Sequence, residues 1–201
     1  ASDVYKRQPY YSSFSAAWVA HCRENALELI QSRSLGADSR VVEIASNDGY
    51  MLRNFHERGI PVLGIDPVPG PAAAAELLGI RTRREFFSLE LAEELATTGE
   101  SADVVLGNNV LAHVADLSGF VSGLRTILKP GGVAVIEAPY VRDLIEQCEF
   151  DTIYHEHLCY FSVTALCRLF NDRGLGLTEV RRLTTHGGSL RVYASPLSLI
   201  H

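Results

Sequence analysis

Several features that mark whole classes of protein are missing from this 201-residue chain. No apolar run approaches the roughly 18 residues of a membrane-spanning helix, and no basic-then-apolar signal segment opens the sequence. Basic residues are fewer than acidic ones, with 18 Lys and Arg against 24 Asp and Glu. An acidic chain is a poor electrostatic partner for a nucleic-acid backbone or an anionic membrane surface. We therefore expect a cytoplasmic protein that binds neither nucleic acid nor membrane.

Cysteine is also scarce. The four cysteines form no C-x-x-C pair, which argues against a zinc knuckle or a thioredoxin-like site, and we expect reduced, half-buried thiols. His155 and His157 flank Glu156, but Cys159 stands where the metalloprotease pattern H-E-x-x-H needs its second histidine. We expect no metal. The four cysteines are Cys22, Cys148, Cys159 and Cys167.

The composition that remains, 47% apolar and 21% charged, is that of a globular domain with a real core. Residues 1–9 show no periodicity, and residues 1–12 are predicted to be a disordered or non-native N-terminal end. Residues 13–201 are predicted to form the core. Both ends of the sequence look cut, so we expect a piece of a longer protein.

Short apolar strands alternate with helices along most of the core, which predicts a parallel sheet covered on both faces. After residue 161 the pattern changes to one helix and two strands. Only Thr184 to Gly188 separate those two strands, too few residues for a parallel crossover, so they must pair antiparallel at one edge. The predicted fold is α/β, a doubly wound, mostly parallel seven-stranded sheet with an edge hairpin. Its strands are expected at 40–45, 62–66, 80–86, 103–107, 133–138, 177–183 and 189–195, its helices at 13–33, 50–58, 71–78, 89–97, 117–128 and 163–173, and a tight turn at 129–132.

Polar groups follow the first, second and fourth predicted strands, at the sheet end where ligands of such folds bind. The turn after the first strand contains only one glycine, Gly49, so the G-x-G-x-x-G fingerprint of dinucleotide folds is absent. Glu43 and Asp48 would repel a pyrophosphate. They would attract a cationic ligand that carries a ribose and a free amino group, as S-adenosylmethionine does. Asp66 is placed to accept hydrogen bonds from both ribose hydroxyls.

The chain resembles class I S-adenosylmethionine-dependent methyltransferases in the segments 43–49, 64–66, 108–113 and 128–132. Within that class, the segments 149–158 and 185–191 resemble those of C-methyltransferases that act on nucleotide-activated keto-deoxysugars. The resemblance implies a Rossmann-like methyltransferase fold and transfer of a methyl group to the carbon beside a ketone, through a base-generated enolate. That family also carries an N-terminal zinc-binding domain and a further C-terminal domain. The cysteines here lack the spacing of such a zinc domain.

Forming a carbon–carbon bond at such a position needs a base to remove a proton and a donor to stabilise the enolate oxygen. By the resemblance, His157 matches the general base, Tyr154 and Glu156 match residues that position or polarise the sugar, and His113 matches a second active-site histidine. The predicted cofactor contacts are Glu43, Ala45, Ser46, Asn47, Asp48, Gly49, Asp66, Pro67, Phe87 and Asn108.

Other interpretations stay open at this point. His186, Gly187 and Gly188 are either substrate contacts or only a hairpin turn. His155 is expected to pack or to bond to backbone, and Phe86 and Phe87 favour core packing over adenine contact. Rival functions are a nicotinamide-dependent oxidoreductase or epimerase, an O-methyltransferase, and a truncated cofactor-binding domain without activity of its own.

Overall fold

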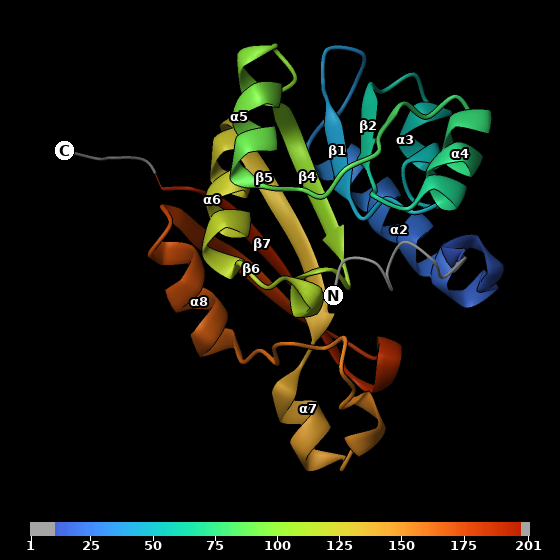
Figure 1. Ribbon diagram of the computed structural model, residues 1–201. Helices are drawn as coiled ribbons and strands as arrows, with labels where there is room; N and C mark the ends of the chain where they lie inside the picture. Colours follow the sequence, from blue (N-terminus) through green and yellow to red (C-terminus); the bar gives the residue numbers. More distant parts are fainter. Residues whose placement is uncertain (1–10, 198–201) are drawn as a thin grey trace. The chain divides into compact units, whose positions relative to one another are not determined.

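The computed structural model describes residues 11–197, and the chain divides into two compact units, residues 1–87 and 88–201 (Figure 1). Of the N-terminal end 1–12, residues 1–10 lie outside the described part. Ser12 is buried and begins a short 3-10 helix, one residue before the predicted start of the core at residue 13.

The first unit contains three parallel strands in the order β3-β2-β1. The strand β1 is buried at all four of its positions, as expected of a central parallel strand. Helix α2 begins at a capped N-terminus, where the Ser15 hydroxyl accepts the Trp18 N–H. The bounds are η1 Ser12–Phe14, α2 Ala16–Ser32, β1 Val41–Ile44, α3 Arg53–His56, β2 Val62–Ile65, α4 Pro69–Leu77 and β3 Thr82–Arg83.

The second unit contains the strands β4-β5-β7-β6. The first pair is parallel, whereas β7 pairs antiparallel with both β5 and β6. Helices α5 and α6 pack side by side, and α8 lies along β6 (Figure 1). The bounds are α5 Leu89–Thr97, β4 Ala102–Asn108, η2 Leu111–His113, α6 Leu117–Ile127, β5 Leu128–Pro139, α7 Val141–Glu146, η3 Phe150–Thr152, α8 Val163–Asn171, β6 Leu175–Leu183, η4 Thr185–Gly187 and β7 Ser189–Pro196.

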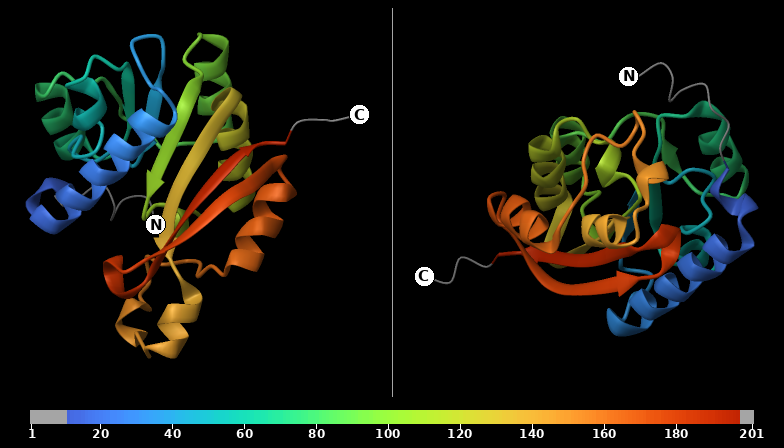
Figure 2. Two further views of the ribbon diagram at one scale, coloured as in Figure 1. Left: turned by 180° about the vertical axis from the view of Figure 1, so that it is seen from behind. Right: turned by 90° about the horizontal axis from the view of Figure 1, so that it is seen from below.

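The predicted fold class is confirmed. Seven strands form a mixed α/β architecture, and the last two pair antiparallel as the short connection between them requires. Figure 2 shows β6 and β7 as two long neighbouring ribbons. The pairing Val180↔Val192 lies in the middle of that hairpin.

Two local predictions are wrong. The helix expected at 50–58 is only the four residues of α3, because residues 47–52 form tight turns and the first bonds of the helix run from residue i to i+3. The tight turn expected at 129–132 belongs instead to β5. The pairing of β5 with β4 shifts register between Leu128 and Val133, and Gly131 within that irregularity has φ +78°.

The predictions for the two phenylalanines at 86–87 and for the cysteines are only partly confirmed. Phe86 is 49% exposed and is therefore not core, whereas Phe87 is half-buried. None of the four cysteines forms a disulfide, but Cys22 is fully buried and Cys148 is exposed, so only Cys159 and Cys167 are half-buried as expected. Within residues 11–197, no helix combines the length and the apolarity that crossing a bilayer demands.

Candidate functional site

An acidic cluster in the first unit surrounds the turn that follows β1. Its members are Glu43 on β1, Asp48 in the turn and Asp66 directly after β2, and all three side chains are buried. Burial raises the pKa of both Glu43 and Asp66, and neighbouring charges add to the rise: those of Asp66 and Asp48 for Glu43, and that of Asp48 for Asp66. Three buried acids so close together are costly unless a positive group joins them.

Glu43 is the most exceptional member. It is 0% exposed, and neither carboxylate oxygen makes a hydrogen bond of ordinary geometry with any described residue. Burial raises the pKa of Glu43 well above the ordinary value of 4.5, although hydrogen bonding from Tyr50 and the Leu52 N–H favours the charged form and partly opposes the rise. A buried acceptor without a partner indicates either strain or a place for a missing donor.

The turn itself is held by Asp66 and by unusual backbone conformations. The carboxylate of Asp66 accepts the N–H of Asn47 at 2.9 Å and that of Val68 at 2.8 Å. Ala45 and Asn47 have φ values of +55° and +50°. Left-handed backbone costs an alanine about 1 kcal/mol, and such strain gathers at ligand sites.

These residues fit a cationic ligand rich in donors. The atoms without a hydrogen-bond partner among the described residues include both oxygens of Glu43, Oδ1 of Asp48 and Oγ of Ser46. All of these are acceptors, or can act as acceptors, and they lie in a negatively charged setting. S-adenosylmethionine supplies an ammonium group, a sulfonium group and two ribose hydroxyls, so its chemistry matches this set.

A lobe of the second unit, residues 141–160, carries the other candidate residues. It leaves the sheet where β5 ends and returns to it, because Tyr140 and Phe161 pair as an isolated bridge. The lobe contains α7 and lies beyond the carboxyl end of β5 (Figure 1). The N–H of Leu158 donates to the carbonyl of Ala112, which attaches the lobe to the segment after β4.

Three predicted catalytic residues meet there as a histidine cluster, formed by His113, Tyr154 and His157. The Tyr154 hydroxyl and Nε2 of His157 are 2.9 Å apart. The ring centroids of His113 and His157 are 4.9 Å apart in an edge-on arrangement. Tyr154 and His157 follow His113 by 41 and 44 positions in the sequence, and they meet it because β4 and β5 are neighbouring strands that end at the same edge.

Backbone carbonyls determine the tautomers of both histidines. Nδ1 of His157 lies 2.9 Å from the Thr152 carbonyl, and Nδ1 of His113 lies 2.9 Å from the Glu156 carbonyl. Because a carbonyl only accepts, each neutral ring donates through Nδ1–H and keeps its lone pair on Nε2. The Tyr154 hydroxyl therefore donates to Nε2 of His157.

Electrostatics keep two members of the cluster uncharged near neutral pH. Burial, assisted by the neighbouring His157, lowers the pKa of His113 below 6.5. Burial, assisted by the charge of Glu156 and by Tyr160, raises the pKa of Tyr154 above 10. His113 is thus a neutral imidazole, and Tyr154 is a protonated hydroxyl able to donate.

The two residues between Tyr154 and His157 behave differently from one another. Glu156 is mostly buried and acts on both His113 and Tyr154 through its charge, consistent with a place in the site. The side chain of His155 is 83% exposed, with Nε2 3.8 Å from Oε1 of Glu156. The expectation that His155 packs is wrong, because the turn points it into solvent.

The predicted substrate segment 186–188 forms the tip of the β6–β7 hairpin. Gly187 and Gly188 have φ +77° and +146°, and a Cβ on either would collide with the carboxylates of Glu149 and Asp143. Both glycines are therefore required by the turn and by its close packing on the lobe. The side chain of His186 lies outside what the structure describes.

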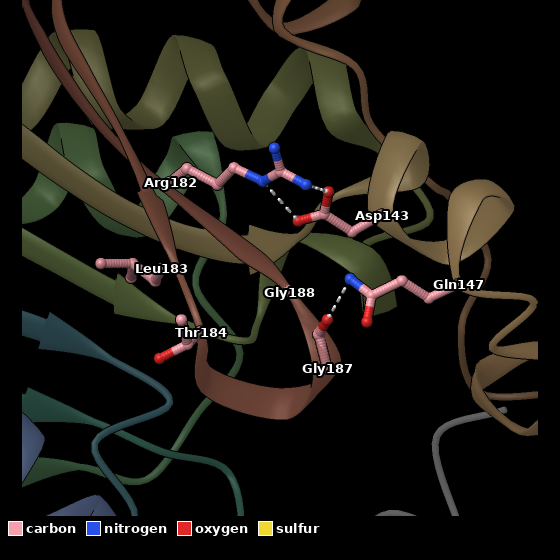
Figure 3. Close-up of a pocket in the computed structure, with 7 residues that line it drawn as sticks. All are labelled: Asp143, Gln147, Arg182, Leu183, Thr184, Gly187 and Gly188. Atoms are coloured by element: carbon pink, nitrogen blue, oxygen red, sulfur yellow. Dashed lines mark hydrogen bonds and ion pairs between the residues drawn. The ribbon is translucent and has the colours of Figure 1, made fainter.

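A pocket of about 470 Å³ lies beside this tip (Figure 3). The Arg182 guanidinium binds the buried Asp143 carboxylate through two nitrogens, and Gln147 donates to the Gly187 carbonyl at 3.1 Å. The two contacts join the hairpin tip to α7 and fix the base of the lobe that carries the histidine cluster.

The remaining cofactor candidates are spread over both units. Gly49, with φ +78°, continues the acidic turn, and Pro67 is half-buried directly after Asp66. Phe87 lies four residues beyond β3 in the first unit. Asn108 is buried at the end of β4, in the second unit. Among residues 11–197, no three His, Cys, Asp or Glu side chains gather as a metal ion would need.

Some residues of these sites were not foreseen. Tyr160 donates to the same Thr152 carbonyl that fixes His157, at 3.4 Å, and Ser13 bonds to Asp48. Neither stands in a recognisable motif. Arg191 forms a buried ion pair with Glu137 at 2.6 Å, and here a signal was available: an acid inside the apolar strand 133–138, like Glu43 in β1.

Comparison with known proteins supplies the family. Residues 18–180 match the family model described as "Methyltransferase domain". The chain is 35% identical over 192 residues to the C-methyltransferase NovU of Streptomyces niveus, which covers 96% of this chain and 46% of NovU. It is 31% identical over 101 residues to a ubiquinone biosynthesis O-methyltransferase of Azorhizobium caulinodans, covering 48% of this chain and 39% of that protein. The chain thus spans less than half the length of these relatives.

Solved structures share the fold at low sequence identity. Magnesium protoporphyrin IX methyltransferase (ChlM) of Synechocystis PCC 6803, determined with bound S-adenosylhomocysteine, superposes with a TM-score of 0.66 at 15% identity, over 88% of this chain and 82% of that one. The PH0226 protein of Pyrococcus horikoshii OT3 gives 0.74 at 14% identity, over 98% and 99%. The family model matches most of this chain, and the identity to NovU extends over 96% of it. The chain therefore belongs to the class I S-adenosylmethionine-dependent methyltransferases.

Proposed function

We propose that this chain is the catalytic core of a C-methyltransferase that moves a methyl group from S-adenosylmethionine to the carbon beside the keto group of a nucleotide-activated deoxysugar. The 35% identity to the C-methyltransferase NovU supports carbon as the acceptor. The sugar is supported by the resemblance of segments 149–158 and 185–191 to those of keto-deoxysugar enzymes. The methyltransferase family does not support the rival oxidoreductase or epimerase.

The arrangement of Tyr154 and His157 carries the proposal. Methylating a carbon beside a ketone requires a base for the carbon-bound proton and a donor for the enolate oxygen. His157 holds a lone pair on Nε2, and the Thr152 carbonyl fixes that tautomer. Tyr154 is protonated and 43% exposed, so its hydroxyl has room to turn from Nε2 to a substrate oxygen. That rotation frees the base and supplies the donor in one movement.

The acidic cluster of the first unit provides the proposed cofactor contacts. Glu43 and Asp48 present unpartnered acceptors to the positively charged groups, and Asp66 accepts from the ribose hydroxyls. S-adenosylmethionine supplies the electrophilic methyl group when bound. The protein then contributes by holding the two reactants close together and aligned, which lowers the activation free energy of such displacements by several kcal/mol. Contacts of His186, Gly187, Gly188, Phe87 and Asn108 with ligands remain predictions.

Replacing His157 by alanine tests the proposal. We expect turnover on a keto-deoxysugar nucleotide to fall about 10²- to 10⁴-fold, because the general base is lost, while the affinity for S-adenosylhomocysteine stays within about twofold. Turnover is measured as transfer of labelled methyl, and affinity by isothermal titration. Exchange of the substrate C–H with solvent deuterium, measured without methyl donor, should disappear in the variant.

His155→Ala is the matched control, since His155 lies two residues away and points into solvent. It should keep both exchange and transfer. Unchanged turnover in His157→Ala contradicts the role of His157. Transfer to the substrate without any C–H exchange indicates an O-methyltransferase. Cofactor binding with no transfer to any keto-sugar nucleotide indicates a cofactor-binding domain that needs further parts, which the 46% coverage of NovU makes the principal alternative.

A further inference from the structure

The segment Tyr11–Phe14 binds the turn that carries the acidic cluster. The Ser12 N–H donates to Oδ1 of Asn47 at 2.9 Å. The Ser13 N–H and the Ser13 hydroxyl both donate to Oδ2 of Asp48, at 3.3 Å and 2.5 Å. These bonds join residues 35 positions apart, so the acidic turn holds the segment in addition to the local bonds of its 3-10 helix.

The same segment also contacts the second loop of the cluster. A Cβ on Gly70, in the first turn of α4, would lie 3.3 Å from the Tyr11 hydroxyl. The segment thus reaches both the turn after β1 and the region after β2, the two loops that hold the acidic cluster. The side chain of Phe14 is 83% exposed, so it adds little to holding the segment in place. The polar bonds to Asn47 and Asp48 are therefore the specific attachment of the segment to the acidic turn.

We propose that Ser13 is a positioning residue of the cofactor site, and that Tyr11–Phe14 is a strap whose attachment strengthens cofactor binding; this rests on the proposed function. Two donors on Oδ2 fix the rotation of the Asp48 carboxylate. Oδ1 of Asp48 is buried and makes no hydrogen bond with any described residue, which leaves it as the acceptor for a ligand. Without the Ser13 hydroxyl, only the longer bond from the Ser13 N–H remains, so the Asp48 carboxylate is held less firmly and must be ordered further when the cofactor binds.

Substitution of Ser13 and isothermal titration with S-adenosylhomocysteine test the inference. Ser13→Ala should weaken binding about tenfold, the usual effect of losing one hydrogen bond to a charged group. Ser13→Thr keeps the hydroxyl and should bind within about twofold of wild type. Ser15→Ala is the matched control in the same segment: its hydroxyl caps α2 and does not touch Asp48, so the variant should lower Tm and leave the affinity within about twofold.

A double-mutant cycle with Asp48→Asn separates positioning from a general loss of order. Ser13→Ala should have less than half of its effect on affinity in the Asp48→Asn background, because the two residues act through one contact. Ser13→Ala with wild-type affinity, or Ser15→Ala weakening binding as much as Ser13→Ala, overturns the inference. Wild-type protein that fails to bind S-adenosylhomocysteine overturns the proposed function, and the inference with it.

Discussion

Among the described residues, two glutamates are buried within sheet strands, one in each unit, and they have opposite surroundings. Glu137 on β5 is 1% exposed and pairs with Arg191 on β7, its register partner, at 2.6 Å. Glu43 on β1 is equally buried, yet no described cation pairs with it, and only Tyr50 and the Leu52 N–H lie close enough to favour its charged form. Sequence alone does not distinguish them, since each is a single acid within an apolar run.

The contrast suggests a structural role for the charge of Glu137 and a ligand-binding role for that of Glu43. The arginine beside Glu137 compensates the cost of burial, so the pair completes the fold. Nothing compensates Glu43 except Tyr50, the Leu52 N–H and whatever ligand enters. A protein retains a buried, uncompensated acid where that acid binds something, because the fold alone would be more stable without it.

Breaking the compensated pair should give the largest effect. Glu137→Ala leaves the buried Arg191 without its partner and should lower the free energy of unfolding by about 3–5 kcal/mol, as measured by urea denaturation. Lys129→Ala is the control: it breaks the Lys129–Asp103 pair, whose side chains are each 33% exposed, and should cost less than about 1 kcal/mol. Equal effects of the two substitutions would mean that burial does not distinguish these pairs.

Neutralising the uncompensated acid should change binding rather than stability. Glu43→Gln keeps the side-chain shape and removes a charge that the fold does not compensate, so the free energy of unfolding should stay the same or rise. The affinity for S-adenosylhomocysteine should fall about 10- to 100-fold, the range for hydrogen bonds to a charged group. Titration calorimetry and urea denaturation measure the two quantities. A destabilised variant with unchanged affinity would make Glu43 a structural residue.

The pH dependence of stability should sharpen the contrast further. The pKa of Glu43 is raised in the folded chain, so the folded state holds this proton more tightly than the unfolded state does. Stability should therefore fall as the pH rises from about 4.5 through the raised pKa, by at most about 1.4 kcal/mol per pH unit for one proton.

The same measurement on Glu43→Gln should give a shallower fall. Part of the dependence should persist, because burial also raises the pKa of Asp66 above its ordinary 3.8. Thermal unfolding of the ligand-free protein between pH 5 and pH 8 records both profiles. Superimposable profiles of wild type and variant would show that Glu43 has the same pKa in the folded and unfolded chain.

Much of the fold was predictable from local patterns. The mainly apolar runs at 41–44, 62–65 and 102–108 form β1, β2 and β4, because a parallel strand covered on both faces is rich in apolar residues. Five residues between the last two strands were enough to predict their antiparallel pairing. The predictions that were wrong, the length of α3 and the turn at 129–132, lie where backbone hydrogen bonds depart from regular patterns.

The candidate sites were predictable as residue types but not as contacts. A buried acid in β1 and a Tyr-x-x-His segment are visible in the sequence. The Thr152 and Glu156 carbonyls that fix the two histidine tautomers carry no residue signature, since every residue has a carbonyl. The attachment of Ser13 to Asp48 spans 35 positions and follows no spacing rule.

Periodicity and composition are local properties of the chain, so they were sufficient to predict the helices and strands along the sequence, the methyltransferase family and the acids in mainly apolar strands. The folded structure was needed to show which buried acid has an arginine partner, and which imidazole nitrogen keeps its lone pair. Those outcomes depend on which distant residue arrives beside each group. That is set by strand register and by the loops that return to the sheet.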